Sequence, residues 1–303
     1  MTRLRVATRG SALAMVQSRL AIDALQRLDP SVEAELVEVR TEGDADRTTP
    51  LRVLGGRGVF VRAVEDALLD GRADIAVHSL KDVPTEVTAG LSLAAVLERG
   101  DPRDALVASE GRRLKDLPEG AKVGTSSPRR AALLHALRPD LEVTDIRGNV
   151  DTRLRQVAMG DVDAVLLAAA GLDRLGRLHE ATQLFEAMEF LPAPGQGAIA
   201  LECRADDEAT RALLARAEHE PTRAAIEAER GFLAALGTGC SLPMGAYAQV
   251  DGDLVALRAM LAHEETGRPL FGEATGKTAE AQLIGRGLGE RMLALARSGA
   301  DTR

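Results

Sequence analysis

Asp82 is the first residue whose type and neighbours suit chemistry. It follows Lys81 directly after an apolar run, and a carboxylate beside a fixed cation is a candidate general acid/base. A Lys-Asp pair at a turn is more often a surface salt bridge, so the assignment depends on anion-binding residues nearby. His78 is a weaker candidate base, because a lone histidine ending a strand is usually packed or hydrogen-bonded.

Cys240 is the candidate for covalent chemistry. It lies in the glycine-rich segment 237–245, where a thiol is accessible and backbone can approach a ligand. Most cysteines are inert and apolar, and Cys203, inside the strand-like residues 199–203, fits that description. No histidine is near Cys240 in sequence, so a Cys/His dyad is weakly indicated. Two cysteines without metal-ligand spacing predict no metal site and a reducing compartment.

Basic residues gather in one stretch of the chain. The formal net charge is −8, yet residues 122–155 hold seven cations and four acids, a local net of +3. Ser126 and Ser127 open a predicted helix that continues with Arg129 and Arg130, and a helix start with arginine forks favours anions. The alternative is an ordinary N-cap with a solvated basic turn. This stretch therefore predicts an anion-binding face.

Composition narrows the class of protein. Of 38 cations 34 are arginine, which suits bidentate binding of carboxylates or phosphates. The negative net charge argues against a general nucleic-acid or anionic-membrane binder, and 2% aromatic residues leave almost no base-stacking surface. The longest uncharged apolar run, residues 164–172, is too short to span a bilayer, and no signal peptide is readable. We expect a soluble cytoplasmic protein.

The elements that must position these residues alternate between strands and helices, which predicts α/β layers with parallel sheets. Leu13, Val16, Leu20 and Leu25 are expected to form the apolar side of the first helix. Strands are expected at residues 4–8, 34–40, 73–78, 122–125, 141–145, 163–168 and 198–203, and helices at 11–28, 60–70, 127–137, 150–159, 206–217, 222–236 and 278–297.

The pattern occurs twice. Residues 6–11 match 123–128, each set preceding a helix, and residues 71–77 match 160–166, each set entering a buried strand. Chance resemblance between generic strand–turn–helix segments is the alternative. Two related lobes would bind a ligand beyond the carboxyl ends of their strands, in a cleft lined by both sets of loops.

Two segments rich in glycine and proline, residues 98–103 and 191–197, are expected to connect the lobes. Two crossings imply that the chain returns to the first lobe after Gly197. The predicted domains are 1–98 with 198–217, then 102–192, and a small α+β domain at 220–303.

Several motifs in one order closely resemble porphobilinogen deaminases, the hydroxymethylbilane synthases of tetrapyrrole biosynthesis. The resemblance runs almost end to end, and each motif alone would be weak. It rests on residues 7–11 (ATRGS), 41–44 (TEGD), 74–84 (DIAVHSLKDVP), 101–104 (DPRD), 123–130 (VGTSSPRR), 145–149 (DIRGN), 194–197 (PGQG) and Cys240 with its flanks.

The resemblance implies a transferase that condenses four porphobilinogen molecules head to tail, releasing four ammonia, to hydroxymethylbilane. It implies two periplasmic-binding-protein-like lobes with a discontinuous first domain, a small α+β C-terminal domain, a monomer, and a dipyrromethane cofactor held by a thioether to Cys240. Asp82 matches the catalytic residue that stabilises the cationic azafulvene. The implied cofactor- and substrate-binding residues are Arg9, Ser11, Ser79, Lys81, Thr125, Ser127, Arg129, Arg130, Arg147, Arg153, Arg174 and Gln196. Arg57 departs from the pattern, because a lysine is expected there in many relatives.

These residue types suit a polyanionic ligand. Every pyrrole carries acetate and propionate, and arginine binds carboxylates that would otherwise be costly to bury. The Asp82 carboxylate is a fixed negative charge that can stabilise the cation formed when ammonia leaves. Two rival functions remain open, a bilobal solute-binding or effector-sensing module and a cysteine-nucleophile transferase. A covalent dipyrrole adduct on Cys240 would distinguish the predicted function from both.

Overall fold

The computed structural model describes residues 2–39, 61–237 and 242–297. The chain divides into two compact units, which we call the first unit (residues 1–100 and 197–223) and the second unit (residues 101–196 and 224–303). The predicted discontinuity of the first lobe is thus confirmed. The predicted domain limits differ from this division, because residues 224–303 group with the second lobe here.

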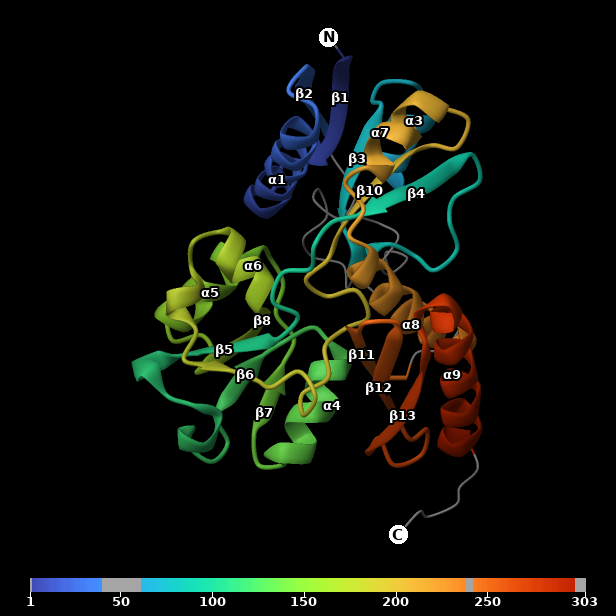
Figure 1. Ribbon diagram of the computed structural model, residues 1–303. Helices are drawn as coiled ribbons and strands as arrows, with labels where there is room; N and C mark the ends of the chain where they lie inside the picture. The colour runs from blue at the N-terminus through green and yellow to red at the C-terminus, as the bar shows by residue number, and fades with distance from the viewer. Residues whose placement is uncertain (1, 40–60, 238–241, 298–303) are drawn as a thin grey trace. The chain divides into compact units, whose positions relative to one another are not determined.

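The first unit is built on a five-stranded sheet of order β2-β1-β3-β10-β4 (Figure 1). Its helices lie over the two faces of that sheet. Its elements are β1 (Thr2–Arg9), α1 (Ala12–Leu28), β2 (Val32–Val39), α3 (Arg62–Leu69), β3 (Ile75–Ser79), a 3-10 turn (Leu80–Asp82), β4 (Leu91–Val96), β10 (Ile199–Arg204) and α7 (Glu208–Ala215), and α8 (Glu220–Leu236) starts at its end.

The second unit repeats the arrangement with a sheet of order β7-β6-β8-β5-β9. Its first elements are β5 (Asp104–Ala108), 3-10 turns at Ser109–Gly111 and Leu114–Asp116, β6 (Lys122–Gly124), α4 (Pro128–Leu137), β7 (Glu142–Thr144), α5 (Val150–Ala158), β8 (Ala164–Ala168), α6 (Ala169–Arg174), a 3-10 turn (Leu178–Glu180) and β9 (Gln183–Leu184).

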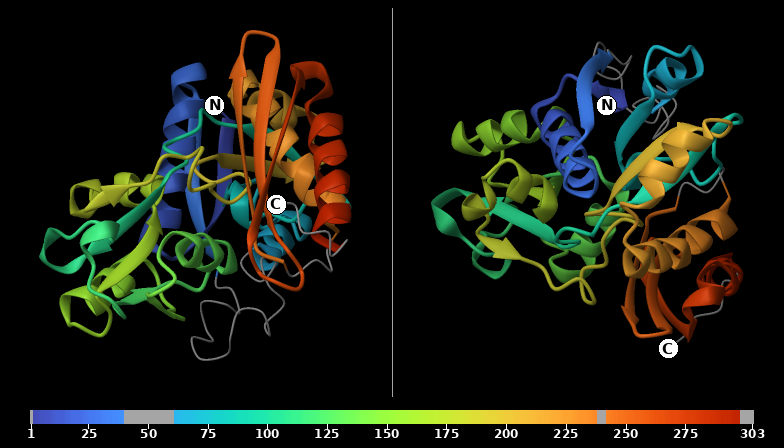
Figure 2. Two further views of the ribbon diagram at one scale, coloured as in Figure 1. Left: turned by 90° about the horizontal axis from the view of Figure 1, so that it is seen from below. Right: turned by 45° about the horizontal axis from the view of Figure 1, so that its top comes forward.

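The third sheet, also in the second unit, is antiparallel, of order β11-β12-β13. Its strands are β11 (Met244–Asp251), β12 (Leu254–Ala262) and β13 (Pro269–Lys277), followed by a 3-10 turn (Thr278–Glu280) and α9 (Ala281–Arg297). Helix α9, red in Figure 2, runs along these orange strands. Met260 of β12 packs into the core that contains Leu133 and Phe190 of the second lobe. Shared burial explains why residues 224–303 group with that lobe.

The internal repeat predicted from the sequence is confirmed at the level of strand register. Val6 pairs with Ile75 in the first sheet, and Val123 pairs with Ala164 in the second. These are the residue pairs that the sequence match predicts. Gly71 and Gly160, also matched, both adopt a positive φ, of 67° and 78°, which a glycine accommodates without strain.

A side-chain contact repeats as well. The Asp74 carboxylate accepts the backbone N–H of Arg5 at 2.9 Å, and the Asp163 carboxylate accepts that of Lys122 at 2.7 Å. The match departs from the prediction in the loop before the first helix of each lobe. The sequence match aligns Ser11 with Pro128, whereas the residues that cap the two helices are Ser11 and Ser127. The loop of the first lobe is therefore one residue longer.

Two predictions about the sheets were wrong in part. The sheets are mixed, because β10 runs antiparallel to β3 and β4, and β5 runs antiparallel to β8. Both β5 and β10 begin directly after a connection between the units, at the edge where the parallel strands end, so they must run back along the sheet. The short, alanine-rich strands β4 and β5 went unpredicted, because alanine gives little strand signal.

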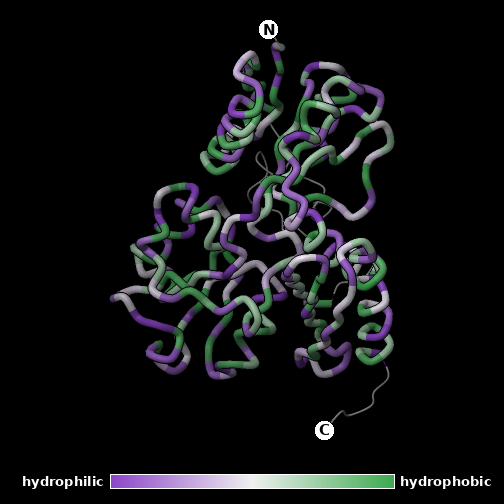
Figure 3. Tube along the Cα trace, viewed as in Figure 1, coloured by the Kyte–Doolittle hydropathy of each residue, from purple (hydrophilic) through white to green (hydrophobic). Residues whose placement is uncertain are grey.

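The buried side of α1 also differs from the prediction. Within its unit the helix buries Gln17, Ser18, Ala21 and Leu25, whereas Leu20 is 41% exposed. Hydrophobic and hydrophilic residues are interspersed along this helix (Figure 3), so its apolar pattern does not single out one face. Two polar residues, Gln17 and Ser18, are buried on this helix instead, and Gln17 reaches the candidate site.

Candidate active site

Asp82 is presented by a short turn at the carboxyl edge of the first sheet. Strand β3 ends at Ser79, and the 3-10 turn that follows is anchored by Leu80, which is 2% exposed. The Leu80 N–H donates to the Ala198 carbonyl at 3.1 Å, and the Val83 N–H closes the turn on the Leu80 carbonyl at 3.1 Å. With Leu80 buried, Lys81 and Asp82 are left half-buried, available to a ligand.

A small pocket opens beside Asp82. The residues that line it include Arg9, Gln17, His78, Ser79 and Asp82, with four apolar residues between them. The structure therefore brings together three of the predicted site residues of the first lobe and adds two that were not assigned to it. Gln17 was missed because the sequence predicted apolar residues on the buried side of α1. A polar residue on that side would have indicated a role near the site.

Two hydroxyls of the first lobe have local structural partners. The Ser79 hydroxyl lies 2.8 Å from Nε2 of Gln17. The Ser11 hydroxyl accepts the Ala14 N–H at 3.3 Å and so caps α1. A capped helix start next to the pocket offers a partial positive charge to an anion.

In the second lobe, Ser127 caps α4 and accepts the Arg130 N–H at 3.4 Å. The Thr125 hydroxyl accepts the Ser127 N–H at 3.1 Å. The predicted N-cap is thus confirmed, but the alternative of a solvated basic turn is wrong, because Arg129 and Arg130 are 4% and 6% exposed.

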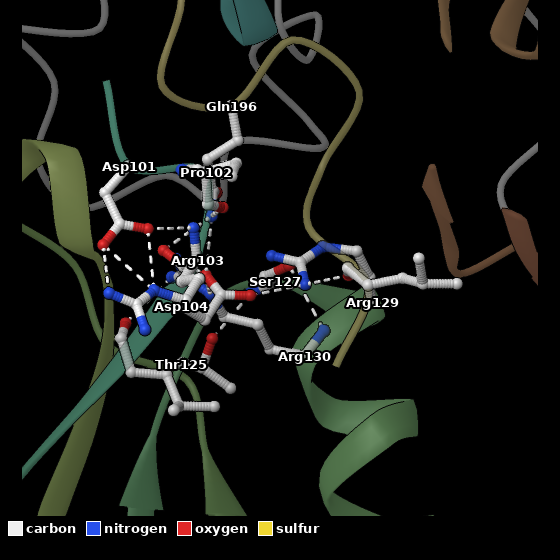
Figure 4. A network of polar contacts seen from close by, with 11 residues as sticks. Asp101, Pro102, Arg103, Asp104, Thr125, Ser127, Arg129, Arg130 and Gln196 are labelled. Carbon is white, nitrogen blue, oxygen red and sulfur yellow. Dashed lines mark hydrogen bonds and ion pairs between the residues drawn. The ribbon is translucent and has the colours of Figure 1, made fainter. Parts of the chain in front are cut away.

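The two arginines share one buried carboxylate, that of Asp104 (Figure 4). Arg129 donates to Asp104 and to the Leu191 carbonyl, both at 2.6 Å. Arg130 donates to Asp104 at 2.6 and 3.0 Å. Asp104 is fully buried, and burial by itself raises the pKa of a carboxyl. The charges of Arg129 and Arg130 outweigh that effect and hold the pKa of Asp104 well below its usual range.

Gln196 belongs to the same network. Its side-chain amide donates to Asp104 at 3.0 Å and to the Pro102 carbonyl at 2.8 Å, and the residue is 1% exposed. It therefore ties together the two segments that connect the units. Asp104 was part of a motif in the sequence but had no predicted role. An acidic residue at the start of an apolar strand could have indicated a buried ion pair.

Three further arginines of the second lobe are partly buried, namely Arg147, Arg153 and Arg174. Arg153 donates from Nε to the Gly148 carbonyl at 3.0 Å. Burial and the charge of Arg130 lower the pKa of Arg153 to about 10, and burial lowers the pKa of Arg174. Both stay protonated at neutral pH, and an anion would offset the cost of desolvating them.

The loop that carries Arg147 needs its glycine. Gly148 has a φ of 111°, and a Cβ there would lie 2.7 Å from the Thr152 side chain. The next residue, Asn149, caps α5 by accepting the Thr152 N–H at 2.9 Å. The loop therefore places Arg147 two residues before the N-cap of α5.

Cys240 and Arg57 lie outside the described residues. The other cysteine, Cys203, is fully buried in β10, where burial raises the pKa of its thiol to about 11 and leaves it an inert thiol at neutral pH. Within the described segments no group of three His, Cys, Asp or Glu is placed to hold a metal ion. None of the helices in those segments has the length and apolar character needed to cross a bilayer.

Comparison with known families gives two matches. The model described as porphobilinogen deaminase, dipyromethane cofactor binding domain, matches residues 4–212. The model described as porphobilinogen deaminase, C-terminal domain, matches residues 224–294. Together they cover nearly the whole chain.

Solved structures with some similarity include several binding proteins. A lipoprotein of the YaeC family from Enterococcus faecalis is 18% identical over 72% of this chain and 91% of its own, with a TM-score of 0.44. A methionine-bound nutrient binding protein from Burkholderia cenocepacia is 16% identical over 69% and 89%, with a TM-score of 0.43. The methionine binding protein MetQ is 10% identical over 77% and 94%, with a TM-score of 0.46.

Proposed function

The chain belongs to the porphobilinogen deaminase family, and from that premise we propose that Asp82 is its catalytic acid/base and Cys240 its point of cofactor attachment. Its reaction is the stepwise head-to-tail condensation of four porphobilinogen molecules to hydroxymethylbilane, with release of ammonia, in tetrapyrrole biosynthesis. The dipyrromethane cofactor supplies the primer on which the chain grows. The protein is a transferase, and the finer assignment to the hydroxymethylbilane synthase type is part of the proposal.

One observation carries the role of Asp82: a buried leucine anchors a turn that leaves a carboxylate at a pocket with Arg9 and Ser79. When ammonia leaves the aminomethyl carbon, positive charge develops there, and a fixed carboxylate stabilises it without reorganising. The same carboxylate can accept the proton that the attacking pyrrole carbon loses.

The arginines suit the carboxylates of a pyrrole chain. Arg153 and Arg174 are cations whose burial has lowered their pKa, so acetate and propionate groups would relieve their desolvation. We propose that they bind the cofactor and the growing chain together with Arg9, Ser11, Ser79, Lys81, Thr125, Ser127, Arg129, Arg130, Arg147 and Gln196. The buried hydrogen bonds to Asp104 fix the orientation of the Arg129 and Arg130 guanidinium groups.

We further propose a cytoplasmic monomer without nucleic-acid or membrane partners, on the basis of its charge, its cysteine usage and its family.

The mass of the intact chain tests the cofactor assignment. Freshly purified protein from cells that make porphobilinogen should carry the mass of a dipyrromethane adduct, and Cys240→Ser should lack it. Cys203→Ser is the matched control and should keep the adduct, because its thiol is buried and protonated. An adduct that survives Cys240→Ser would refute the attachment site, and an unmodified parent chain would favour a solute-binding module.

A further inference from the structure

Three acidic and basic side chains are buried together beside the Asp82 pocket. Nε2 of His78 lies 3.0 Å from a carboxylate oxygen of Glu202, and these side chains are 4% and 1% exposed. Strand register explains the contact. His78 faces Ala200 across β3 and β10, and Glu202 faces Ala76, so His78 and Glu202 are diagonal neighbours on one face of the sheet.

Glu65, on α3, is the third member of the cluster and is 8% exposed. Burial, followed by repulsion from Glu202, raises the pKa of Glu65. The cluster thus places two carboxyl groups and one imidazole together in the interior. Negative charge buried there without a counter-charge is costly, and a proton taken up by the cluster offsets it. The cluster is therefore suited to take up a proton.

His78 also lines the pocket that contains Asp82, together with Arg9, Gln17 and Ser79. The charged groups that face it are thus Glu202 from β10, Glu65 from α3, and Asp82 and Arg9 at the pocket. Among the described residues, Glu202 is the hydrogen-bond partner of the His78 ring, at Nε2. A carboxylate on one ring nitrogen orients the imidazole and stabilises its protonated form.

We propose that His78, oriented by Glu202, takes up the proton that each condensation releases beside Asp82. The inference rests on the proposed role of Asp82. The aminomethyl group, protonated as an ammonium, leaves with its bonding electron pair as ammonia, and the electron pair of the attacking pyrrole carbon forms the new C–C bond. That carbon then loses its proton to the Asp82 carboxylate, from which the proton passes to His78. Before the next addition the proton returns to ammonia or solvent. His78 is thus a positioning and proton-holding residue.

Single-turnover addition of porphobilinogen to the holoenzyme, measured against pH, tests this inference. His78→Gln keeps a donor toward Glu202 but cannot titrate, so its rate should fall by a factor on the order of 10² while KM stays close to the parent value. The limb of the pH profile that reports His78 should disappear, and added imidazole should restore part of the rate. Glu202→Gln should shift that limb to lower pH, because the imidazolium loses its carboxylate.

His219→Gln is the matched control, because His219 is a half-buried histidine of the same unit, 2.8 Å from the Thr222 hydroxyl and outside the pocket. It should leave rate and profile unchanged. A His78→Gln holoenzyme with the parental rate and pH profile would overturn the inference. If Asp82→Asn retains turnover while His78→Gln loses it, the role of Asp82 fails instead.

A measurement on the wild-type holoenzyme covers the case in which His78→Gln does not fold. The ¹⁵N resonances of the His78 ring should titrate within the pH range of activity. A ring that stays neutral through that range would refute proton uptake by His78.

Discussion

Arg130 and Asp104 are joined by two hydrogen bonds to one carboxylate oxygen, at 3.0 Å from Nε and 2.6 Å from Nη2. The oxygen also accepts the Gln196 amide at 3.0 Å, and the second oxygen accepts Arg129 at 2.6 Å. One buried carboxylate therefore organises the basic start of α4 and the connections between the units. Its removal affects both stability and the anion-binding face.

Asp104→Asn is expected to lower the free energy of unfolding by about 3–5 kcal/mol, because two buried guanidinium groups lose the carboxylate that they share. Denaturant unfolding of the holoenzyme measures the change. Asp140→Asn is the control, because Asp140 pairs with Arg138 at the surface, and its midpoint should stay near that of the parent. Equal midpoints for Asp104→Asn and the parent would contradict the buried-pair account.

The same carboxylate predicts a component of acid sensitivity. Since the folded pKa of Asp104 is lowered, its contribution is complete above the unfolded pKa and is lost as pH falls toward the folded value. The stability difference between parent and Asp104→Asn should therefore shrink as pH falls below about 4. Thermal unfolding of both proteins at a series of pH values measures this stability difference. A stability difference that grows as pH falls would contradict the lowered pKa of Asp104.

The chain offers a close control for the catalytic assignment. Leu80-Lys81-Asp82 and Leu114-Lys115-Asp116 are the same tripeptide in the same 3-10 conformation, but Asp116 is exposed and Asp82 lines the pocket. Asp82→Asn should keep the adduct mass and lose turnover by a factor on the order of 10² to 10⁴. Asp116→Asn should have parental turnover. Comparable activity in the two variants would remove the basis for the role of Asp82.

Arg153 and Arg155 provide a second matched pair, two residues apart on α5. Arg153 is partly buried with a pKa lowered to about 10, whereas Arg155 is exposed. Arg153→Leu should raise KM for porphobilinogen or slow chain elongation, and it should not lower thermal stability, because it removes a desolvated cation near Arg130. Arg155→Leu should leave kinetics unchanged. Loss of stability without a kinetic effect in Arg153→Leu would indicate a structural role.

Arg147 can be tested by the same assay. Arg147→Leu should impair cofactor assembly or chain elongation, since the residue lies in the loop two residues before Asn149, which caps the start of α5. The adduct mass and the distribution of enzyme-bound chain lengths report the two effects separately. A variant with full adduct and normal elongation would count against an anion-binding role for this loop.

Sequence alone predicted the order of most elements and the internal repeat. The repeat could be predicted because hydrophobic alternation fixes which residues of a strand face the core, so matched residues such as Val6 and Val123 occupy the same register. The motif around Asp82 could be placed at a strand end for the same reason. Short alanine-rich strands such as β4 gave no comparable signal, because their pattern fits helix, strand or loop.

Only the tertiary structure determined which polar groups meet. Asp104 and Arg130 are 26 residues apart, and His78 and Glu202 are 124 apart, so no local pattern links them. Their contacts arise from strand order and register, which depend on the packing of the whole sheet. The sequence thus determined which side chains could carry charge and chemistry. Folding decided which of those charges are neutralised in the interior and which stand at the pocket, because burial makes an uncompensated charge too costly to leave unpaired.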